Sequence, residues 1–478
     1  MTTVAIPSRN DLSSLAIAII CVSLGALVMA VALLVTRWEN GYTQLMLVIG
    51  TAVVMTFILA RNIFIEKDPL RLSSTIPMAY LFFLMPNSVA LALEFRTSSL
   101  YLFKVLQHTI SIYDEDTTAA LAVMFAGSLA YGLGVVIGNR TPGLDDRLVS
   151  RAPARSWSVR AGRPLVLGSV LVTLFLIALL FLTGGPTGIV ALIVDPVARD
   201  ELQSTSLTAL LISLFLGYLA TISVAYGRDL VNGVFPLRPS SLILYGLAIA
   251  MALPLASRGY VLSVMIYPVL LFHYLQKRIP ATAVLVAALT LPAIATALRL
   301  LRVDAVGDFS TTNSFTEFFS ESNMVSMFSA AMGALRSGKI DYTYGLDLAL
   351  FALWFIPRAL WPGKYLPLDY RLTMALDISD NGRAYGSPVT IFGGLYLNLT
   401  LIGMVVALLL LGYIIARCDQ RLSVHTPRGL FVRIMLFTFL VDLTRVGDVS
   451  RELSVLFLQS SMFIFVASVV RLPRVKHK

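Results

Sequence analysis

The chain is poor in the residues that build disulfide frameworks, zinc sites and soluble surfaces. It has two cysteines, four histidines and only 13% charged residues in 478 positions. The cysteines, Cys21 and Cys418, fall in an expected membrane span and an expected inner loop, so no disulfide framework is implied. The histidines are His108, His273, His425 and His477. Their scatter matches no zinc-ligand spacing, and we expect neither a metal nor another cofactor.

Long apolar runs are abundant instead, and hydrophobic residues make up 57% of the chain. About 20 apolar residues in a helix cross a bilayer core of about 30 Å. The pattern predicts an all-α polytopic membrane protein with about 12 transmembrane helices and one long periplasmic loop. We place the spans at 14–36, 42–60, 75–93, 119–138, 164–182, 207–226, 240–256, 260–275, 280–298, 387–413, 430–443 and 453–470.

Charge is divided unevenly between the two faces that these spans define. The face that carries both termini holds 22 basic and 7 acidic residues, and the other face holds 15 basic and 20 acidic residues. Basic residues collect on the cytoplasmic side of membrane proteins, so we expect both termini in the cytoplasm. The net charge of +10 is therefore largely topological, and it predicts no nucleic-acid partner.

The chain divides into three parts. Residues 1–298 carry nine spans with short loops, 299–386 form the long polar loop, and 387–478 carry three spans and a basic tail. In the loop, Leu348–Phe355 is an apolar run too short to cross, and it predicts a re-entrant or interfacial helix. The earlier outer loop Glu94–Thr118 predicts an interfacial helix near Leu100. We interpret its acidic triplet Asp114–Asp116 as an exposed loop, with a divalent-cation site as the alternative.

Three arginines lie at expected outer borders of the membrane: Arg258, Arg358 and Arg445. The simplest explanation is that their side chains reach up to the interface. The alternative is that their planar guanidinium groups bind a lipid pyrophosphate, since arginine pairs with phosphate oxygens through two parallel hydrogen bonds. We favour the second hypothesis, because ionisable residues at membrane depth are usually functional.

Acidic and aromatic residues supplement these arginines. Asp448 follows Arg445 closely, and it either forms a local pair that shapes a turn or acts as a general base. Aromatic residues crowd the long loop, where they form an interfacial belt, a platform for sugar rings, or both. They are Tyr342, Tyr344, Trp354, Trp361, Tyr365, Tyr370 and Tyr385.

Two motifs in the second half resemble a known family. Ile356–Lys364 reads IPRALWPGK, and Gly394–Gly403 reads GLYLNLTLIG. Together with the Ser257–Gly259 turn and the Arg445–Asp448 stretch, they resemble the O-antigen and oligosaccharide repeat-unit polymerases of the Wzy type. The resemblance covers about residues 256–450.

That resemblance implies a glycosyltransferase that joins undecaprenyl-pyrophosphate-linked repeat units at the periplasmic face of the bacterial inner membrane. It implies the fold of multi-spanning lipid-sugar glycosyltransferases. Membrane lipid, a chain-length regulator and a flippase are further candidate partners.

The motif positions supply the expected site residues. We expect Arg258, Arg358, Lys364 and Arg445 to bind the pyrophosphate, Asp448 and Arg445 to be catalytic, and Tyr385, Tyr396 and Asn398 to contact the glycan. The chain departs from the family at two points. It has Gly393-Gly394 where the family often shows Gly-Glu, and Thr400 where a glycine often stands. The missing acid leaves the catalytic base open.

Three other functions remain as alternatives. An O-antigen ligase would resemble this chain, but such ligases use a histidine in the large loop, and residues 299–386 contain none. A lipid-sugar flippase or transporter predicts charged residues deep within spans or paired broken helices. A membrane scaffold without chemistry leaves the outer basic residues unexplained.

Overall fold

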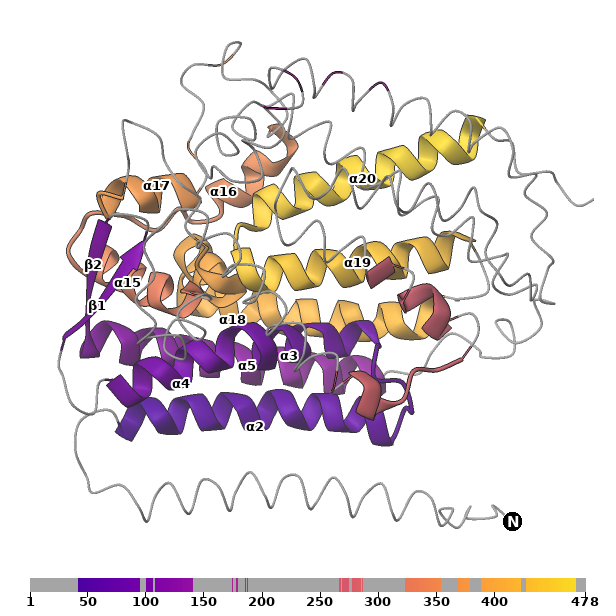
Figure 1. The fold of residues 1–478 in the computed structure, drawn as a ribbon, viewed down its shortest axis with the longest axis horizontal. Coiled ribbons are helices and arrows are strands. Elements are labelled where there is room, and N and C mark those ends of the chain that lie inside the picture. Colours follow the sequence, from indigo (N-terminus) through magenta and orange to yellow (C-terminus); the bar gives the residue numbers. More distant parts are fainter. Residues whose placement is uncertain are drawn as a thin grey trace, which may run out of the picture.

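A computed structural model describes the arrangement of part of the chain. It describes residues 42–94, 100–105, 108–140, 323–353, 368–378, 388–422 and 427–469, with short stretches between 266 and 286 and a few single residues. Helices dominate these parts, and the long ones lie side by side in a bundle (Figure 1).

Six long helical segments form the bundle. They are α2 (Tyr42–Phe64), the broken segment η1–α3–η2–α4 (Leu72–Ser74, Thr75–Ala79, Tyr80–Leu84 and Met85–Glu94), α5 (Asp114–Arg140), α18 (Thr390–Arg421), α19 (Pro427–Val446) and α20 (Val449–Val469). Their positions match the expected spans at 42–60, 75–93, 119–138, 387–413, 430–443 and 453–470. Within the described residues, four helical segments are long and apolar enough to cross a membrane: Tyr42–Phe64, Leu72–Glu94, Asp114–Arg140 and Thr390–Arg421. The chain is thus a helical membrane protein in its described part, whereas the other expected spans lie wholly or largely outside it.

Shorter elements gather at one end of the bundle. They are the strands β1 (Leu100–Val105) and β2 (His108–Tyr113) and the helices α15 (Met324–Arg336), α16 (Leu346–Ala349), η3 (Leu350–Leu353) and α17 (Leu368–Ala375). We call this end the hairpin end (left in Figure 1).

The strands correct one expectation. The stretch around Leu100 is not an interfacial helix: it pairs antiparallel with the next stretch, from Leu100 opposite Tyr113 to Val105 opposite His108. Both segments are rich in β-branched and aromatic residues, which favour strands. Their apolar content alone had suggested an interfacial helix.

A second correction concerns the acidic triplet. Asp114, Glu115 and Asp116 form the first turn of α5 rather than an exposed loop, and Asp116 is buried. Negative charge stabilises a helix N-terminus because the backbone N–H groups there lack partners. Arg336 of α15 also pairs with Glu115 and with Asp116, whose Oδ2 lies 3.1 Å from its Nη2. The triplet therefore anchors α15 on α5.

The bundle exposes apolar side chains along its flanks. On α18, Ile402 is 77% exposed, and Val406, Leu410 and Ile414 continue the stripe at intervals of four residues. Leu129, Leu133 and Ile137 do the same on α5. A continuous apolar stripe of this length is unfavourable in water and suits contact with lipid tails.

Glycines bring α5 and α18 into backbone contact. A side chain at Gly134 would meet the carbonyl of Leu409, and one at Gly412 would meet the carbonyl of Tyr131. Small residues at such crossings let membrane helices approach closely, where dispersion forces hold them together.

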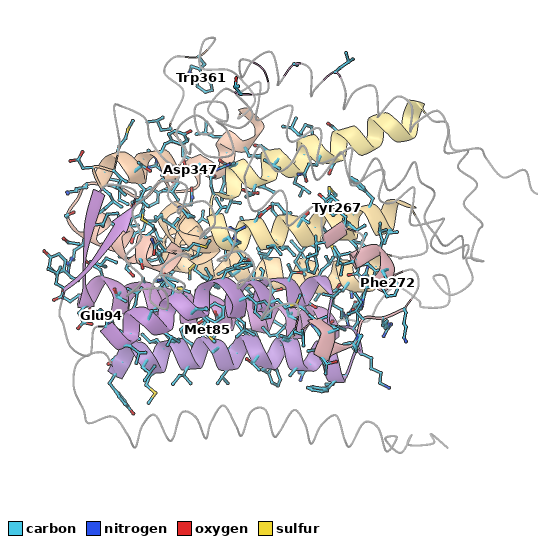
Figure 2. All side chains as sticks on the ribbon, viewed as in Figure 1. Met85, Glu94, Tyr267, Phe272, Asp347 and Trp361 are labelled. Atoms are coloured by element: carbon cyan, nitrogen blue, oxygen red, sulfur yellow. The ribbon has the colours of Figure 1, made fainter. Side chains whose placement is uncertain are left out.

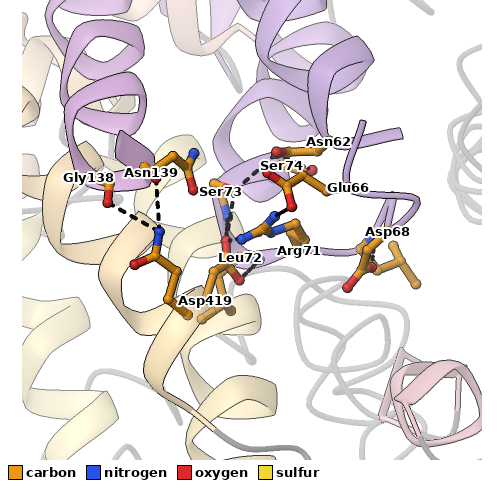
Figure 3. Close-up of polar contacts among 12 residues, drawn as sticks. Asn62, Glu66, Asp68, Arg71, Leu72, Ser73, Ser74, Gly138, Asn139 and Asp419 are labelled. Carbon is orange, nitrogen blue, oxygen red and sulfur yellow. Dashed lines mark hydrogen bonds and ion pairs between the residues drawn. The ribbon is translucent and has the colours of Figure 1, made fainter. Parts of the chain in front are cut away.

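The opposite end of the bundle is closed by a buried carboxylate, that of Asp419 (Figure 3). Its Oδ1 accepts the N–H of Leu72 at 2.9 Å, and its Oδ2 accepts the N–H and hydroxyl of Ser73 at 3.0 and 2.7 Å. The guanidinium groups of Arg71 and Arg433 each lie 3.5 Å away. Both carboxylate oxygens are satisfied, so this Asp419 network joins α18 and α19 to η1 and leaves no site for a ligand on the carboxylate.

The long helices alternate in direction between these two ends. At the hairpin end, Gln44 donates to Asp114, and the N–H of Val389 donates to Val446 at 3.1 Å. At the Asp419 end, Asn62 donates to Ser73 at 3.0 Å. The topology expected from the sequence places these same two sets of helix ends on opposite faces of the membrane.

Candidate active site at the hairpin end

The described residues include half of the expected site. Arg445, Asp448, Tyr396 and Asn398 all lie at the hairpin end. Arg258, Arg358, Lys364 and Tyr385 lie outside the described residues, as do Arg299, Arg302 and Arg383, so their roles stay predictions.

A break in α18 creates the framework of the site. Thr400 has φ 63° and ψ −178°, a conformation that glycine adopts freely and a β-branched residue does not. The break leaves carbonyls of the preceding turn without their helical N–H donors. The connection between α15 and α16 uses two of them: Thr343 N–H donates to Leu397 at 3.1 Å, and Gly345 N–H donates to Asn398 at 2.7 Å.

The side chain of Asn398 locks this connection in place. Its Oδ1 accepts the hydroxyl of Thr343 at 2.7 Å, and its Nδ2 donates to the carbonyl of Gly394 at 2.8 Å. The residue is 1% exposed. Asn398 was expected to contact the glycan, but its Oδ1 holds the connecting loop and its Nδ2 bonds the preceding turn of α18, so the geometry indicates a positioning role.

We predict that Thr400→Gly raises the stability of the protein. The left-handed conformation of a β-branched residue costs about 1–3 kcal/mol, and part of that is regained with glycine. Thermal unfolding in detergent should show a gain of about 1 kcal/mol. The control is Thr51→Gly in the regular helix α2, which should lose about 1 kcal/mol. Equal losses in both variants would contradict a strained break.

Tyrosines line the connection that docks on this break. Tyr342 donates its hydroxyl to that of Tyr396 at 2.7 Å, with the two rings edge to face at 5.5 Å. Burial and this hydrogen bond raise the pKa of Tyr342, so its phenol stays neutral. The ring centre of Tyr344 lies 6.0 Å from that of Tyr342, and Tyr344 is 77% exposed. An exposed aromatic ring packed on a half-buried aromatic pair is a surface on which a sugar ring can stack.

Asp347 and Arg371 form a buried pair that the sequence did not reveal. Arg371 Nη2 donates to Asp347 Oδ2 at 2.7 Å, and Arg371 Nε donates to the carbonyl of Leu366 at 3.2 Å. Asp347 is 2% exposed and lies beside α17 and α20 (Figure 2). In the sequence, Asp347 stands at the start of an apolar run, and only its charge distinguishes it from its neighbours. Arg371 was one of eight outer arginines with no motif to single it out.

The turn between α19 and α20 packs tightly on the start of α18. Gly447, at φ 77°, fits against Thr390, and a side chain at Gly394 would run into the carbonyl of Gly447. A side chain at Gly393 would meet the ring of Phe328 at 2.6 Å. This packing explains why the chain has Gly393-Gly394 and no acid at this point.

We predict that Gly394→Ala is strongly destabilising. The added methyl group meets rigid backbone rather than a flexible side chain, so the turn must move, at a cost of about 3 kcal/mol or more. Thermal unfolding of the purified variant measures this. Gly132→Ala is the matched control, because its methyl group meets side chains rather than backbone, those of Ile58 at 3.3 Å and Val54 at 3.4 Å. Similar unfolding temperatures for both variants would contradict the close approach.

Asp448 caps α20. Its Oδ1 accepts the hydroxyl of Ser450 at 3.1 Å and the N–H of Arg451 at 3.0 Å, the usual pattern of an aspartate N-cap. The residue is 3% exposed, and its Oδ2 is buried without a hydrogen-bond partner among the described residues. One carboxylate oxygen of Asp448, the expected catalytic acid, is therefore used to cap α20.

Arg445 is held loosely by contrast. Its Nη1 lies 3.6 Å from Oδ1 of Asp442, and its guanidinium carbon lies 5.0 Å from the ring centre of Phe83. Its Nε is buried, and nothing in the described part of the chain accepts a hydrogen bond from it. A guanidinium has five N–H donors, so Arg445 has unused capacity for an anion.

Two more ionisable residues follow on the first turn of α20: Arg451 and the buried Glu452. They stand just before an apolar run, where no sequence motif marks them. With Asp442, Arg445 and Asp448, they place five charged groups around one turn. Arg336, a further arginine at this end of the bundle, pairs with Glu115 and Asp116 instead.

The described residues contain no group of three or more histidine, cysteine or acidic side chains placed to hold a metal ion. The cluster we call the hairpin-end site comprises Arg371, Arg445, Arg451, Asp347, Asp448, Glu452 and the three tyrosines Tyr342, Tyr344 and Tyr396. Comparison with protein-family models, curated proteins and solved structures finds no match to this chain.

Proposed function

We propose that the chain is a glycosyltransferase that polymerises undecaprenyl-pyrophosphate-linked repeat units into a surface polysaccharide. The observation that carries this proposal is the hairpin-end site itself. Guanidinium groups, an exposed tyrosine surface and buried carboxylates gather at one end of a bundle whose flanks are apolar. A substrate with a lipid tail, a diphosphate and a sugar presents the same three chemistries in one molecule.

The arginines supply the interaction that such a reaction needs most. Negative charge develops on the leaving pyrophosphate as its bond to the anomeric carbon breaks. Preorganised donors in a water-poor site stabilise that charge strongly. Arg445 has free donors for it, and the sequence motifs place Arg258, Arg358 and Lys364 on the same expected face.

The surroundings support a lipid-borne substrate. The apolar stripes on α5 and α18 suit a lipid environment, so a polyprenyl tail can stay in the bilayer while its head group enters the site. We propose the bacterial inner membrane as the location, with the hairpin end facing the periplasm. A flippase that delivers the donor and a chain-length regulator are the proposed partners.

Polysaccharide profiling of a deletion strain tests the proposal. A polymerase predicts surface lipid that carries single repeat units, restored to long chains by the wild-type gene. Long polymer that accumulates on its carrier would identify a ligase instead. Loss of all surface glycan, with lipid-linked units trapped in the cytoplasm, would identify a flippase.

A further inference from the structure

Asp347 is a buried carboxyl group of the hairpin-end site with one unsatisfied oxygen. Its Oδ2 is held by Arg371 at 2.7 Å, whereas its Oδ1 is buried and has no hydrogen-bond partner among the described residues. An unsatisfied buried oxygen is costly, and proteins retain such groups mainly where they are used.

The other acids at this end of the bundle are fixed to long helices. Asp448 also has one oxygen without a partner among the described residues, but its other oxygen caps α20 and holds the side chain on that helix. Asp442 and Glu452 lie with Arg445 and Arg451 on α19 and α20, where they are fixed to the expected membrane-spanning helices. Asp347 lies outside the long helices, in the segment that carries the tyrosines.

We propose that Asp347 is the general base of the transfer reaction. This inference rests on the proposed function, and it replaces Asp448 as the proton acceptor.

The step balances as follows. The hydroxyl oxygen of the acceptor sugar forms the new bond to the anomeric carbon of the donor glycan. The bond from that carbon to the pyrophosphate oxygen breaks, and the polyprenyl pyrophosphate leaves with its electron pair. The hydroxyl proton passes to Asp347, while Arg371 keeps the carboxylate oriented.

The position of Asp347 links it to the proposed sugar surface. The exposed ring of Tyr344 lies three residues before it, and Gly345 lies between them. Tyr344 and Gly345 both have positive φ values, 49° and 85°. This left-handed pair turns the chain into α16, so Asp347 follows directly on the segment that carries the exposed ring.

The electrostatics suit a base that works near neutral pH. Burial and the charge of Asp448 outweigh Arg371 and raise the pKa of Asp347 to about 6. The other charged groups on packed elements are Arg451 and Glu452 on α20. A carboxyl group with this pKa is ionised at pH 7.5, yet it is basic enough to accept the proton of a reacting hydroxyl group. Activity should therefore rise with pH through about 6 and then level off.

The test uses full-length protein in detergent with a synthetic polyprenyl-pyrophosphate-linked repeat unit. Asp347→Asn should lower kcat at least about a hundredfold and leave KM within about threefold. Asp347→Glu should recover part of the rate with a displaced pH midpoint. Asp377→Asn is the matched control, because this exposed aspartate lies just after α17 and asparagine tolerates its positive φ. It should keep wild-type activity.

A second measurement is independent of activity. Because the folded protein binds the Asp347 proton more tightly than the unfolded chain does, stability falls as pH rises from about 4 to about 6. Asn cannot ionise, so Asp347→Asn should lose the fall in unfolding temperature that wild type shows over this pH range. Lower stability together with wild-type kcat would show a purely structural partner of Arg371 and overturn the proposal.

The outcomes separate the two proposals. Wild-type protein that forms no glycosidic bond refutes the polymerase and the base together. Active wild type with equally active Asp347→Asn refutes only the base, and loss of activity in Asp448→Asn alone would return that role to Asp448.

Discussion

Replacing Arg445 by alanine is expected to abolish long polymer while the protein still accumulates in the membrane. Loss of one preorganised donor to a developing oxyanion lowers rates by about 10²–10³. Folding should survive, because among the described residues Arg445 makes a 3.6 Å contact with Asp442, a cation–π contact with Phe83 and a longer-range interaction with Glu452, but no short ion pair. Gel profiles of surface polysaccharide from a complemented deletion strain measure the first effect, and immunoblots of membranes measure the second.

Two further variants make this prediction specific. Arg445→Lys should restore little activity, because an ammonium group cannot present two parallel hydrogen bonds to a phosphate. Arg336→Ala is the matched control: it removes an arginine from the same end, but one that is half-exposed and paired with Glu115 and Asp116. It should leave chain length unchanged. Full-length chains from Arg445→Ala would refute the role of Arg445.

Replacing Asp419 by alanine is expected to remove the folded protein itself. Two guanidinium groups, from Arg71 and Arg433, lose their buried partner, and the N–H groups of Leu72 and Ser73 lose their acceptors. Breaking a buried ion pair by removing one partner costs about 3–5 kcal/mol, which is much of the stability of a typical domain. The measurement is the fraction of monodisperse protein after heating in detergent.

The control for this prediction is Asp377→Asn at the opposite end, since asparagine tolerates the positive φ of this residue. Asp377 is exposed, so its removal should change the unfolding temperature little. Asp419→Asn keeps the shape and one acceptor oxygen, and it should fall between the two. If Asp419→Ala were as stable as wild type, the network could not be what closes this end of the bundle.

The sequence predicted the long helices well because membrane spans are defined by length and hydropathy alone. All six described long segments stand where their apolar runs predicted them. The relative direction of neighbouring helices was also predicted, because helices that are joined by short loops run in opposite directions. Close packing was harder to predict: Gly134 and Gly412 look like any glycines in a membrane helix until their partners are known.

The misses have a common physical cause. A local apolar pattern does not separate a strand from an interfacial helix, so Leu100–Val105 was assigned wrongly. Asp347 and Asp419 sit beside ordinary apolar and charged stretches, and their importance comes from partners 24 and 346 positions away. Such pairings depend on tertiary structure, which no local pattern encodes.

The two departures from the polymerase motif now have structural contexts. Gly394 abuts the carbonyl of Gly447, which leaves no room for an acidic side chain. Thr400 adopts the backbone conformation that a glycine at that position would adopt without strain. The missing acid directs attention to the carboxyl groups nearby, of which Asp347 has the most suitable surroundings.

Reconstitution provides the most direct test of the central claim. Purified protein in liposomes would receive a labelled polyprenyl-pyrophosphate-linked repeat unit, and the products would be resolved by size. The account predicts a ladder of longer glycans, with one polyprenyl pyrophosphate released per bond formed, and no ladder with Arg445→Ala. Repeat units that stay single in the presence of stable wild-type protein, or that only change leaflet, would contradict it.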